Sequence, residues 1–396
     1  MDPRRNPYTP NAGAPPPLLV GRDDQLASFD ILLARLEKGH TEQSMIITGL
    51  RGVGKTVLLG EFRGKAESRG WAALEAEITK QTDFGNRMAH LARRALLHVA
   101  PRSRWKDVAR KAAGVLKSFT LTVSSDGSLS AALDIDPVEG LADSGDLSDD
   151  LTDLFVALGE LARAHKTGVV FLIDEIQFLS SAHLEALIAA LHKTVQRALP
   201  VTMVGAGLPQ IPRLAGEAKS YAERLFKFPR IGSLPHRQAV EALVGPARAL
   251  DVIYEPGAVE EMVAYTEGYP YFLQEYGRIV WDEAEADTIA MRHVRAALPL
   301  VEAKLDDGFF RVRAERCSRH ELRYLRAMAE LGAAPQRASD VAALLGRSTA
   351  QLGPVRSRLI DKGLLYTPGY GLAAFTVPQV DAYLKRAYPL QVDDLA

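Results

Sequence analysis

Hydrophobic and polar positions follow two alternating periods along the first half of the chain. Apolar residues at helical spacing run from about Gln25 to Leu36, and a short apolar segment at 44–48 precedes a glycine-rich loop and a second helix from Lys55. The same patterns predict strands over 71–78, 168–173 and 200–205, and helices over 86–99, 151–164 and 183–199. Strands that alternate with helices favour an α/β fold with a parallel sheet covered on both faces.

The second half of the chain changes character twice. Over about 237–310 the apolar spacing is helical throughout, which predicts a lid of helices. Beyond it we expect helices over 321–331 and 341–345, a third with Val355, Leu359 and Ile360 on one face, and strands over 364–366 and 372–377. Three helices and a β-wing are the layout of a winged helix. Residues 1–18 are rich in proline, and we expect an extended arm there.

Residues 103–146 interrupt the alternation and are interpreted as an insertion. Apolar residues alternate over 119–123 and again over 129–135, on either side of Ser125-Asp126-Gly127. A two-residue Asp-Gly turn would put the two apolar sets on opposite faces, whereas a three-residue loop with Gly127 in the left-handed conformation puts them on one face. We therefore predict a hairpin with a glycine bulge, followed by a mobile acidic loop over 143–150.

Composition narrows the classes of protein that fit. The 396 residues are 47% hydrophobic and 24% charged with a formal net charge of −1, so any affinity for nucleic acid must come from a local patch. The single cysteine, Cys317, excludes an internal disulfide and a thiolate metal site. No apolar run approaches the roughly 20 residues that span a bilayer. We expect a cytoplasmic protein with no membrane partner.

The glycine-rich loop carries the strongest chemical signal. Residues 49–56 fit the phosphate-loop pattern GxxxxGK[ST] in full, between a strand and a helix. Its glycines let consecutive N–H groups curl around a phosphate at the positive end of the following helix. Lys55 is expected to reach the β- and γ-phosphates of ATP, and the Thr56 hydroxyl to ligate Mg²⁺. The predicted nucleotide-binding residues here are Gly49, Leu50, Arg51, Gly52, Val53, Gly54, Lys55, Thr56 and Val57.

A second acidic signal follows an apolar strand. Val169–Ile173 is apolar on both faces and ends in Asp174-Glu175, and parallel sheets bind ligands at the carboxyl ends of their strands. Asp174 is expected to hold Mg²⁺, directly or through water. Glu175 is expected to polarise the attacking water, because phosphoryl transfer depends on positioning and charge stabilisation. Together with Lys55, these residues predict a Mg²⁺-dependent ATPase.

These motifs, in this order, resemble the AAA+ ATPases, specifically the branch of archaeal-type ATPases and origin-recognition-like initiators. STAND-class regulators share several of the features. The resemblance covers nearly the whole chain, from Val20 to about Arg386. It implies a parallel-sheet P-loop core over 19–235, a helical lid over 236–312 and a C-terminal winged-helix domain over 313–396.

Three shorter segments extend the resemblance. Val20 and Gly21 belong to a segment similar to the "VGR(E/D)" box, which implies that they lie against adenine. Pro270 ends a Gly-x-Pro sequence similar to that of the lid, which implies a contact with the nucleotide. Arg224 follows the fourth strand, where similar proteins carry an arginine finger. A surface or core-rim arginine is the alternative, since a finger needs a neighbouring subunit or a moving domain.

One departure from the family concerns the end of the fourth strand. Residues 204–207 are small where many AAA+ proteins place a polar sensor, and the one polar group nearby in sequence is Gln210. This departure favours a slowly hydrolysing switch over a processive motor. The lid arginine of the second sensor has no clear match, and Arg278 is its candidate.

The C-terminal segment has a modest positive charge. Residues 311–396 contain thirteen lysines and arginines and eight aspartates and glutamates, a net charge of +5. The predicted third helix carries polar types that suit contacts with phosphates and base edges. The candidate DNA-binding residues are Ser348, Thr349, Gln351, Arg356, Arg358 and Lys362. Winged helices also serve as protein-docking or autoinhibitory modules, so both interpretations stay open.

Three functions are compatible with these patterns. The leading hypothesis is an ATP-dependent switch that binds double-stranded DNA through the winged helix. The alternative is a STAND-like signalling ATPase whose winged helix binds protein. A third is a helper ATPase that loads another machine, in which the hairpin within 103–146 docks a partner protein or a second copy of the chain.

Overall fold

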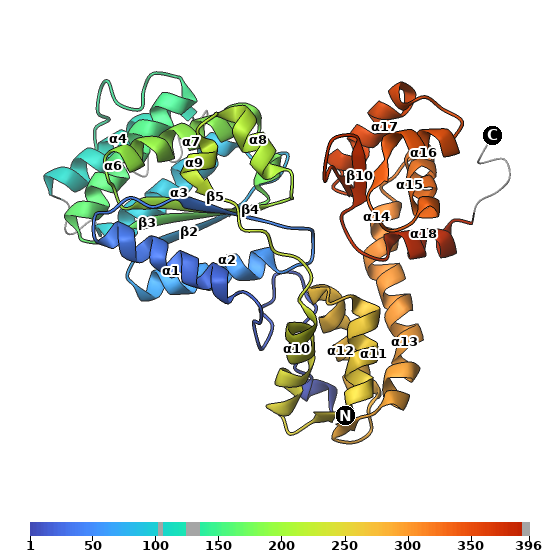
Figure 1. Cartoon of the computed structure of the whole chain (residues 1–396). Helices are drawn as coiled ribbons and strands as arrows, with labels where there is room; N and C mark the ends of the chain where they lie inside the picture. Colours follow the sequence, from blue (N-terminus) through green and yellow to red (C-terminus); the bar gives the residue numbers. More distant parts are fainter. Residues whose placement is uncertain (102–105, 124–134, 390–396) are drawn as a thin grey trace. The chain divides into compact units, whose positions relative to one another are not determined.

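The computed structural model describes residues 1–101, 106–123 and 135–389 (Figure 1). The chain divides into two compact units. One unit consists of residues 22–49 and 55–231, and the other of residues 1–21, 50–54 and 232–396. Among the described residues, none of the helices is both long enough and apolar enough to cross a membrane.

The first unit is built on a five-stranded sheet. Its strands are β1 (Ser44–Thr48), β2 (Ala72–Glu77), β3 (Val169–Asp174), β4 (Val201–Gly207) and β5 (Phe226–Lys227). Their order is β2-β3-β4-β1-β5, and every pair is parallel. Every residue of β1, β3 and β4 is buried, whereas alternate residues of the edge strand β2 reach the surface. The predicted parallel α/β class is confirmed.

Helices cover both faces of this sheet. They are α1 (Asp23–Glu37), α2 (Lys55–Ser68), α3 (Phe84–Val99), α4 (Asp107–Val123), α6 (Leu147–Ala164), α7 (Ser181–Gln196), α8 (Ile211–Ala218) and α9 (Ala222–Leu225). Figure 1 shows α1 and α2 below the sheet and α3, α4, α6 and α7 above it. A 3₁₀ turn, η3 (Ile176–Phe178), follows β3 directly. Because β3 lies between these two helical layers, its side chains are apolar on both faces.

The predicted hairpin was wrong in its first strand. Residues 119–123 form the end of helix α4, where Phe119 is fully buried while Leu121 is 53% exposed. In a strand these two side chains would share a face, but in a helix they lie 200° apart. Burial at Ala109, Ala112, Leu116 and Phe119 follows the helical period over about three turns, which outweighs a short alternation. The predicted turn and the second strand, up to residue 134, lie outside the described residues.

The acidic segment over 143–150 was predicted to be a mobile loop, and this was also wrong in part. Helix α6 begins at Leu147, and Asp146 caps it by accepting the N–H groups of Ser148 (2.8 Å) and Asp149 (3.1 Å). Asp150 is only 1% exposed and accepts the Ser144 N–H group at 2.9 Å. These carboxylates satisfy backbone donors at a helix start, so their charge orders the segment.

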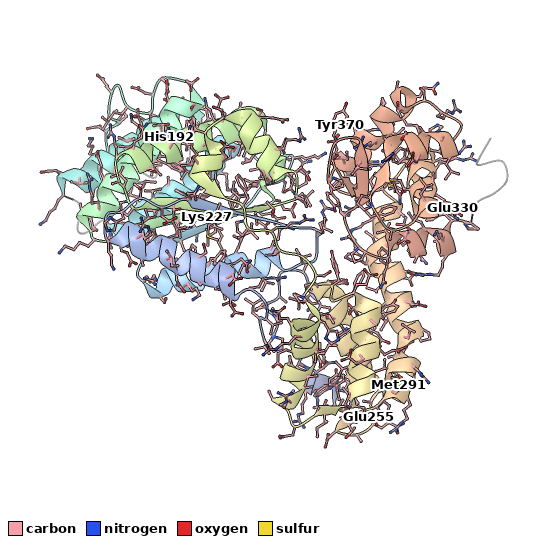
Figure 2. The ribbon with its side chains drawn as sticks, in the orientation of Figure 1. His192, Lys227, Glu255, Met291, Glu330 and Tyr370 are labelled. Atoms are coloured by element: carbon pink, nitrogen blue, oxygen red, sulfur yellow. The ribbon has the colours of Figure 1, made fainter. Side chains whose placement is uncertain are left out.

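The second unit contains a helical segment and a C-terminal segment. The helical segment has α10 (His236–Arg248), α11 (Pro256–Thr266), α12 (Pro270–Glu283) and α13 (Met291–Leu305), with a short parallel pair of β6 (Ile253–Tyr254) and β7 (Thr288–Ile289). The Met291 N–H group donates to the Glu255 carboxylate at 3.0 Å, which joins the start of α13 to that of α11 (Figure 2). Helix α13 continues through a π-helical turn, η4 (Asp306–Arg311), and α14 (Val312–Ala314).

The C-terminal segment contains three helices, a small sheet and a final helix. The elements are α15 (Arg319–Leu331), β8 (Gln336–Arg337), α16 (Ala338–Leu344), α17 (Thr349–Asp361), β9 (Leu365–Tyr366), β10 (Leu372–Phe375) and α18 (Val380–Ala387). The sheet is antiparallel in the order β8-β10-β9. Tyr370, in the turn between β9 and β10, is fully exposed (Figure 2). The three predicted helices and two predicted strands occur in the expected order, but β8 and α18 were not predicted.

The N-terminal arm packs along the helical segment of this unit. Tyr8 is 3% exposed, and its hydroxyl donates to the Leu243 carbonyl at 2.6 Å. Its ring lies so close to Gly277 that an added Cβ there would approach a ring atom to 2.7 Å. The absence of a side chain at Gly277, in the middle of α12, therefore allows the arm to pack against this helix.

Candidate functional site

The phosphate loop connects the central strand β1 to helix α2. Its first residue is fixed by the neighbouring strand, because the Gly49 N–H group donates to the Gly207 carbonyl at 3.1 Å. Gly52 (φ +77°) and Gly54 (φ +90°) adopt backbone angles that favour glycine. Nothing lies within 4 Å of a Cβ built on Gly54. Positive-φ glycines at a helix start, with open space over Gly54, have the geometry of a phosphate cradle.

Lys55 is held over this loop. It is the first residue of α2, it is only 6% exposed, and its Nζ donates to the Gly49 carbonyl at 3.2 Å. A buried ammonium at a helix N-terminus adds positive charge where the helix dipole is already positive. Two positive charges close together favour the binding of an anion. The position of Lys55 therefore suits the phosphate contact that the motif predicts.

The two predicted Mg²⁺ ligands lie together. The Thr56 hydroxyl donates to Asp174 Oδ2 at 2.5 Å, and Asp174 is 8% exposed at the carboxyl end of β3. The other oxygen of Asp174, Oδ1, accepts the Glu175 N–H group at 2.8 Å. A hydroxyl and a carboxylate are oxygen ligands of the kind that Mg²⁺ takes beside substrate phosphates. The residues present therefore fit a Mg²⁺-bound nucleotide.

Glu175 is turned by its backbone. It has φ +55° and ψ +37°, a left-handed conformation that non-glycine residues adopt rarely, and it begins the turn η3. Its carboxylate Oε2 accepts a hydrogen bond from Nε2 of Gln177, two residues later. Sequence reasoning missed Gln177. The available signal was a polar residue in an apolar turn, opposite a strand that ends in glycine.

Other predicted nucleotide contacts belong to the second unit. Gly21 has φ +67°, and Pro270 starts α12 at the position where proline suits a helix. The neighbouring Tyr269 is 1% exposed, and its hydroxyl has no hydrogen-bond partner among the described residues. The phosphate-loop residues 50–54 cluster with this unit, and a Cβ built on Gly52 would lie 3.2 Å from the Tyr269 ring. Glycine at position 52 is thus required by its neighbour as well as by its φ.

Arg224, the predicted arginine finger, lies on the short helix α9. Its side chain is exposed, and its carbonyl accepts a hydrogen bond from Gln43 Nε2 at 3.0 Å. An exposed guanidinium on a backbone anchored in this way is available to a neighbouring molecule.

The predicted DNA-binding residues lie on helix α17 and at its two ends. Several of them make hydrogen bonds within their own segment. Ser348 and Gln351 form a reciprocal capping box, in which the Gln351 side chain accepts the Ser348 N–H group at 3.0 Å. Arg356 Nη2 donates to the Leu372 carbonyl of β10 at 2.6 Å, so it ties the helix to the sheet. Thr349 and Arg358 have exposed side chains.

Glu321 gathers the remaining cations of α17. It is 1% exposed, and it accepts a hydrogen bond from Lys362 Nζ at 2.7 Å and pairs with Arg358 at 3.4 Å. Burial by itself would raise the pKa of Glu321, but the hydrogen bonds from Lys362 and Ser318 outweigh it and lower the pKa to about 2. Two of the three predicted basic contacts are therefore paired with a carboxylate of their own segment.

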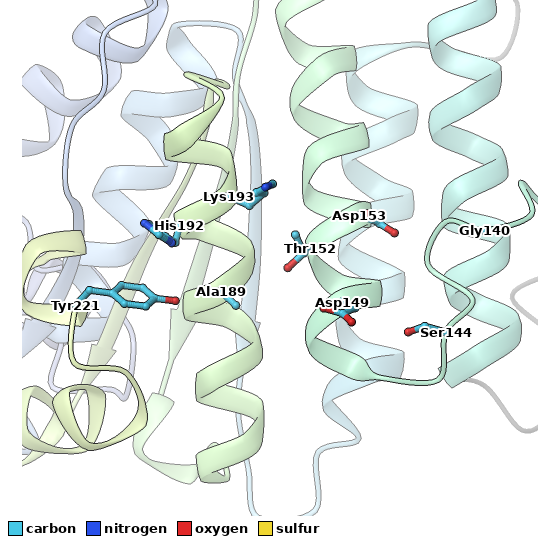
Figure 3. A pocket seen from close by; sticks show the side chains of 9 residues that line it. All are labelled: Gly140, Ser144, Asp149, Thr152, Asp153, Ala189, His192, Lys193 and Tyr221. Atoms are coloured by element: carbon cyan, nitrogen blue, oxygen red, sulfur yellow. The ribbon is translucent and has the colours of Figure 1, made fainter.

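A separate groove of about 510 Å³ lies between α6 and α7 in the first unit (Figure 3). Its polar lining includes Ser144, Asp149, Asp153, His192, Lys193 and Tyr221. The ring of His192 packs on that of Tyr221, with centroids 4.4 Å apart. The groove carries both signs of charge and contains none of the predicted phosphate-binding residues.

Sequence comparison agrees with the geometry of the first unit. Residues 18–204 match a family model described as an AAA ATPase domain, and residues 307–384 match one described as a domain of unknown function. A comparison with curated proteins finds no match.

Structural comparison finds solved structures that are similar over most of the chain. A Walker-type ATPase of Pyrococcus abyssi superposes with a TM-score of 0.56 at 15% identity, covering 93% of this chain and 96% of that one. The Orc1 protein of Aeropyrum pernix in complex with DNA (TM-score 0.46, 16% identity, 96% of each chain) and the RuvB Holliday junction branch migration motor of Thermotoga maritima (0.44, 18%, 94% and 96%) are also similar. The first of these supports the fold. With the match at residues 18–204, the parallel sheet and the phosphate loop, the chain contains an AAA ATPase domain of the P-loop type.

Proposed function

We propose that this protein hydrolyses ATP slowly in the presence of Mg²⁺ and acts as a nucleotide-dependent switch that binds double-stranded DNA. The observation that carries the ATPase part is the Thr56–Asp174 hydrogen bond of 2.5 Å beside the phosphate loop. Thr56 and Asp174 would hold Mg²⁺, which supplies charge neutralisation at the phosphates when bound. Lys55 would bind the β- and γ-phosphates, and Val20, Gly21 and Pro270 would contact the rest of the nucleotide.

Glu175 is the proposed general base. A carboxylate at the carboxyl end of β3, next to the Mg²⁺ ligand, is suited to orient and polarise a water molecule. Arg224 would act on the nucleotide of a neighbouring subunit, for which its exposed position is suited. The protein would then hydrolyse ATP efficiently only when associated.

The DNA-binding part is supported by the C-terminal segment. We interpret residues 313–396 as a winged helix, because α15, α16 and α17 are followed by the antiparallel pair β9 and β10, whose connecting turn exposes Tyr370. Residues 311–396 have a net charge of +5, which favours phosphate backbones. Ser348, Thr349, Gln351 and Arg358 would contact the duplex from α17.

One observation favours a second candidate, a signalling ATPase whose winged helix binds protein. Arg356 and Lys362 make internal hydrogen bonds of 2.6 and 2.7 Å, which removes them from the cations that are free to meet phosphates. A helix with few uncommitted cations suits a protein surface better than a polyanion.

Fluorescence anisotropy with a labelled random-sequence duplex distinguishes the two candidates. The Glu175→Gln protein is titrated with ATP or ADP present at several salt concentrations. Binding that is tighter with ATP and weakens with salt supports the DNA switch, and the slope counts the phosphates engaged. The absence of binding with either nucleotide would reject the DNA switch in favour of the signalling ATPase.

A further inference from the structure

The end of strand β4 is shaped to receive a side chain from another element. Its last residue, Gly207, has no Cβ, and a Cβ built there would lie 2.8 Å from Oε1 of Gln177. The other close neighbours of that position, Ile176 and Ile211, are apolar. The carboxamide of Gln177 therefore occupies the space that a polar side chain at the end of β4 would fill.

The Gln177 carboxamide makes one hydrogen bond at each of its ends. Its Oε1 accepts the Leu208 N–H group at 3.2 Å, directly after β4. Its Nε2 donates to Oε2 of the Glu175 carboxylate. Because the Gly207 carbonyl also accepts the Gly49 N–H group at 3.1 Å, a short hydrogen-bonded path joins the start of the phosphate loop to Glu175.

We infer that Gln177 is a positioning residue for Glu175 and supplies, from the turn after β3, the polar group that β4 lacks. The inference rests on the proposed function, in which Glu175 is the general base. Holding one carboxylate oxygen fixes the side-chain rotamer and leaves Oε1 as an acceptor for the water proton. Precise placement matters because a displacement of about 1 Å at a reacting group can cost on the order of 100-fold in rate.

Two alternatives to a positioning role for Gln177 can be distinguished from it by experiment. Gln210 lies closer to β4 in sequence, but its Oε1 is buried with no hydrogen-bond partner among the described residues. Alternatively, Gln177 only closes the turn η3 as a structural residue. A structural role would change stability and ATP affinity, whereas a positioning role changes turnover at unchanged affinity.

The experiment compares kcat, ATP affinity by calorimetry and Tm for the full chain and four variants. Gln177→Ala removes both hydrogen bonds. Gly207→Ala keeps Gln177 but displaces its carboxamide, and Gly207 has no positive φ that would strain alanine. Gln210→Ala tests the alternative residue. Gln196→Ala, at the exposed end of α7, is the matched control.

Gln177→Ala and Gly207→Ala are each expected to lower kcat by about tenfold or more, with ATP affinity within about twofold of wild type. Gln196→Ala is expected to behave as wild type. Wild-type turnover by Gln177→Ala, or a loss confined to Gln210→Ala, would overturn the inference while leaving the ATPase proposal intact. A wild-type chain that binds ATP but never hydrolyses it, or a Glu175→Gln variant with normal turnover, would instead overturn the proposed function.

Discussion

The phosphate-loop end of the sheet and helix α17 were both predicted to bind phosphate groups, and they differ in what their polar side chains already do. At the sheet, the hydrogen bonds of Lys55 and Thr56 go to the site itself, to Gly49 and Asp174, beside the open backbone of Gly54. On α17, Arg356 and Lys362 bond to groups of their own segment. A spaced motif specifies geometry as well as residue type, whereas a count of charges specifies only residue type. The difference separates a strong prediction from a weak one.

The largest expected effect is at Lys55. Lys55→Ala should weaken ATP binding by at least about 100-fold, because it removes a charge-assisted contact to the phosphates from a buried site. Calorimetric titration with ATP measures this. Lys65→Ala is the matched control, since Lys65 is on the same helix and pairs with Asp30 at 2.7 Å. Equal affinity in both variants would mean that the loop does not bind the nucleotide.

Glu175 should separate binding from turnover. Glu175→Gln keeps the size of the side chain but removes the base, so we expect kcat to fall by roughly 100-fold or more with ATP affinity preserved. Steady-state phosphate release and calorimetry on the same preparation give the two quantities. Normal phosphate release would show that another group activates the water.

The pairing of Arg358 and Lys362 with Glu321 can be tested by replacing Glu321. Because its pKa is lowered to about 2 in the folded chain, the carboxylate stabilises the fold above its ordinary pKa, and that stability is lost as the pH falls from about 4.5 toward 2. The shift corresponds to about 3 kcal/mol. Glu321→Gln should therefore increase hydrogen exchange in α15 and α17 at neutral pH. Exchange rates identical to wild type would show that the three charges are not coupled.

The smallest expected effect is on DNA affinity. Arg358→Ala should lower duplex affinity a few-fold and reduce the salt slope by about one, as expected for the loss of a single phosphate contact. Lys385→Ala, on α18, is a control with the same charge change. An equal effect of both variants would indicate non-specific attraction to the charge of the whole segment, and would weaken the assignment of α17.

Sequence alone predicted strands β1 to β4, though not the edge strand β5, together with the sheet class. It also predicted that Thr56 and Asp174 serve one Mg²⁺ site, because a phosphate loop and a buried strand both end at the same sheet edge. It failed at 119–123, where alternation over five residues fits a strand and a helix almost equally well. Leu116 and Phe119 are three residues apart and both buried, a spacing that indicates a helix. Gln177 and Glu321 were missed for another reason, since their hydrogen bonds reach Leu208 and Lys362 in other elements, and the local pattern offered only a polar residue in an apolar turn as a signal for Gln177.

The strand order also sets the distance between the two strands that carry the site. Strand β4 lies between β3, which carries Asp174, and β1, which leads into the phosphate loop. Neighbouring strands are about 4.8 Å apart, so the backbones of β3 and β1 are separated by roughly 10 Å, two strand spacings, and the Thr56–Asp174 hydrogen bond bridges that separation. Gly207 ends the intervening strand, and a bulkier residue there would meet Gln177, Ile176 and Ile211, so it would push against both the turn after β3 and the start of α8.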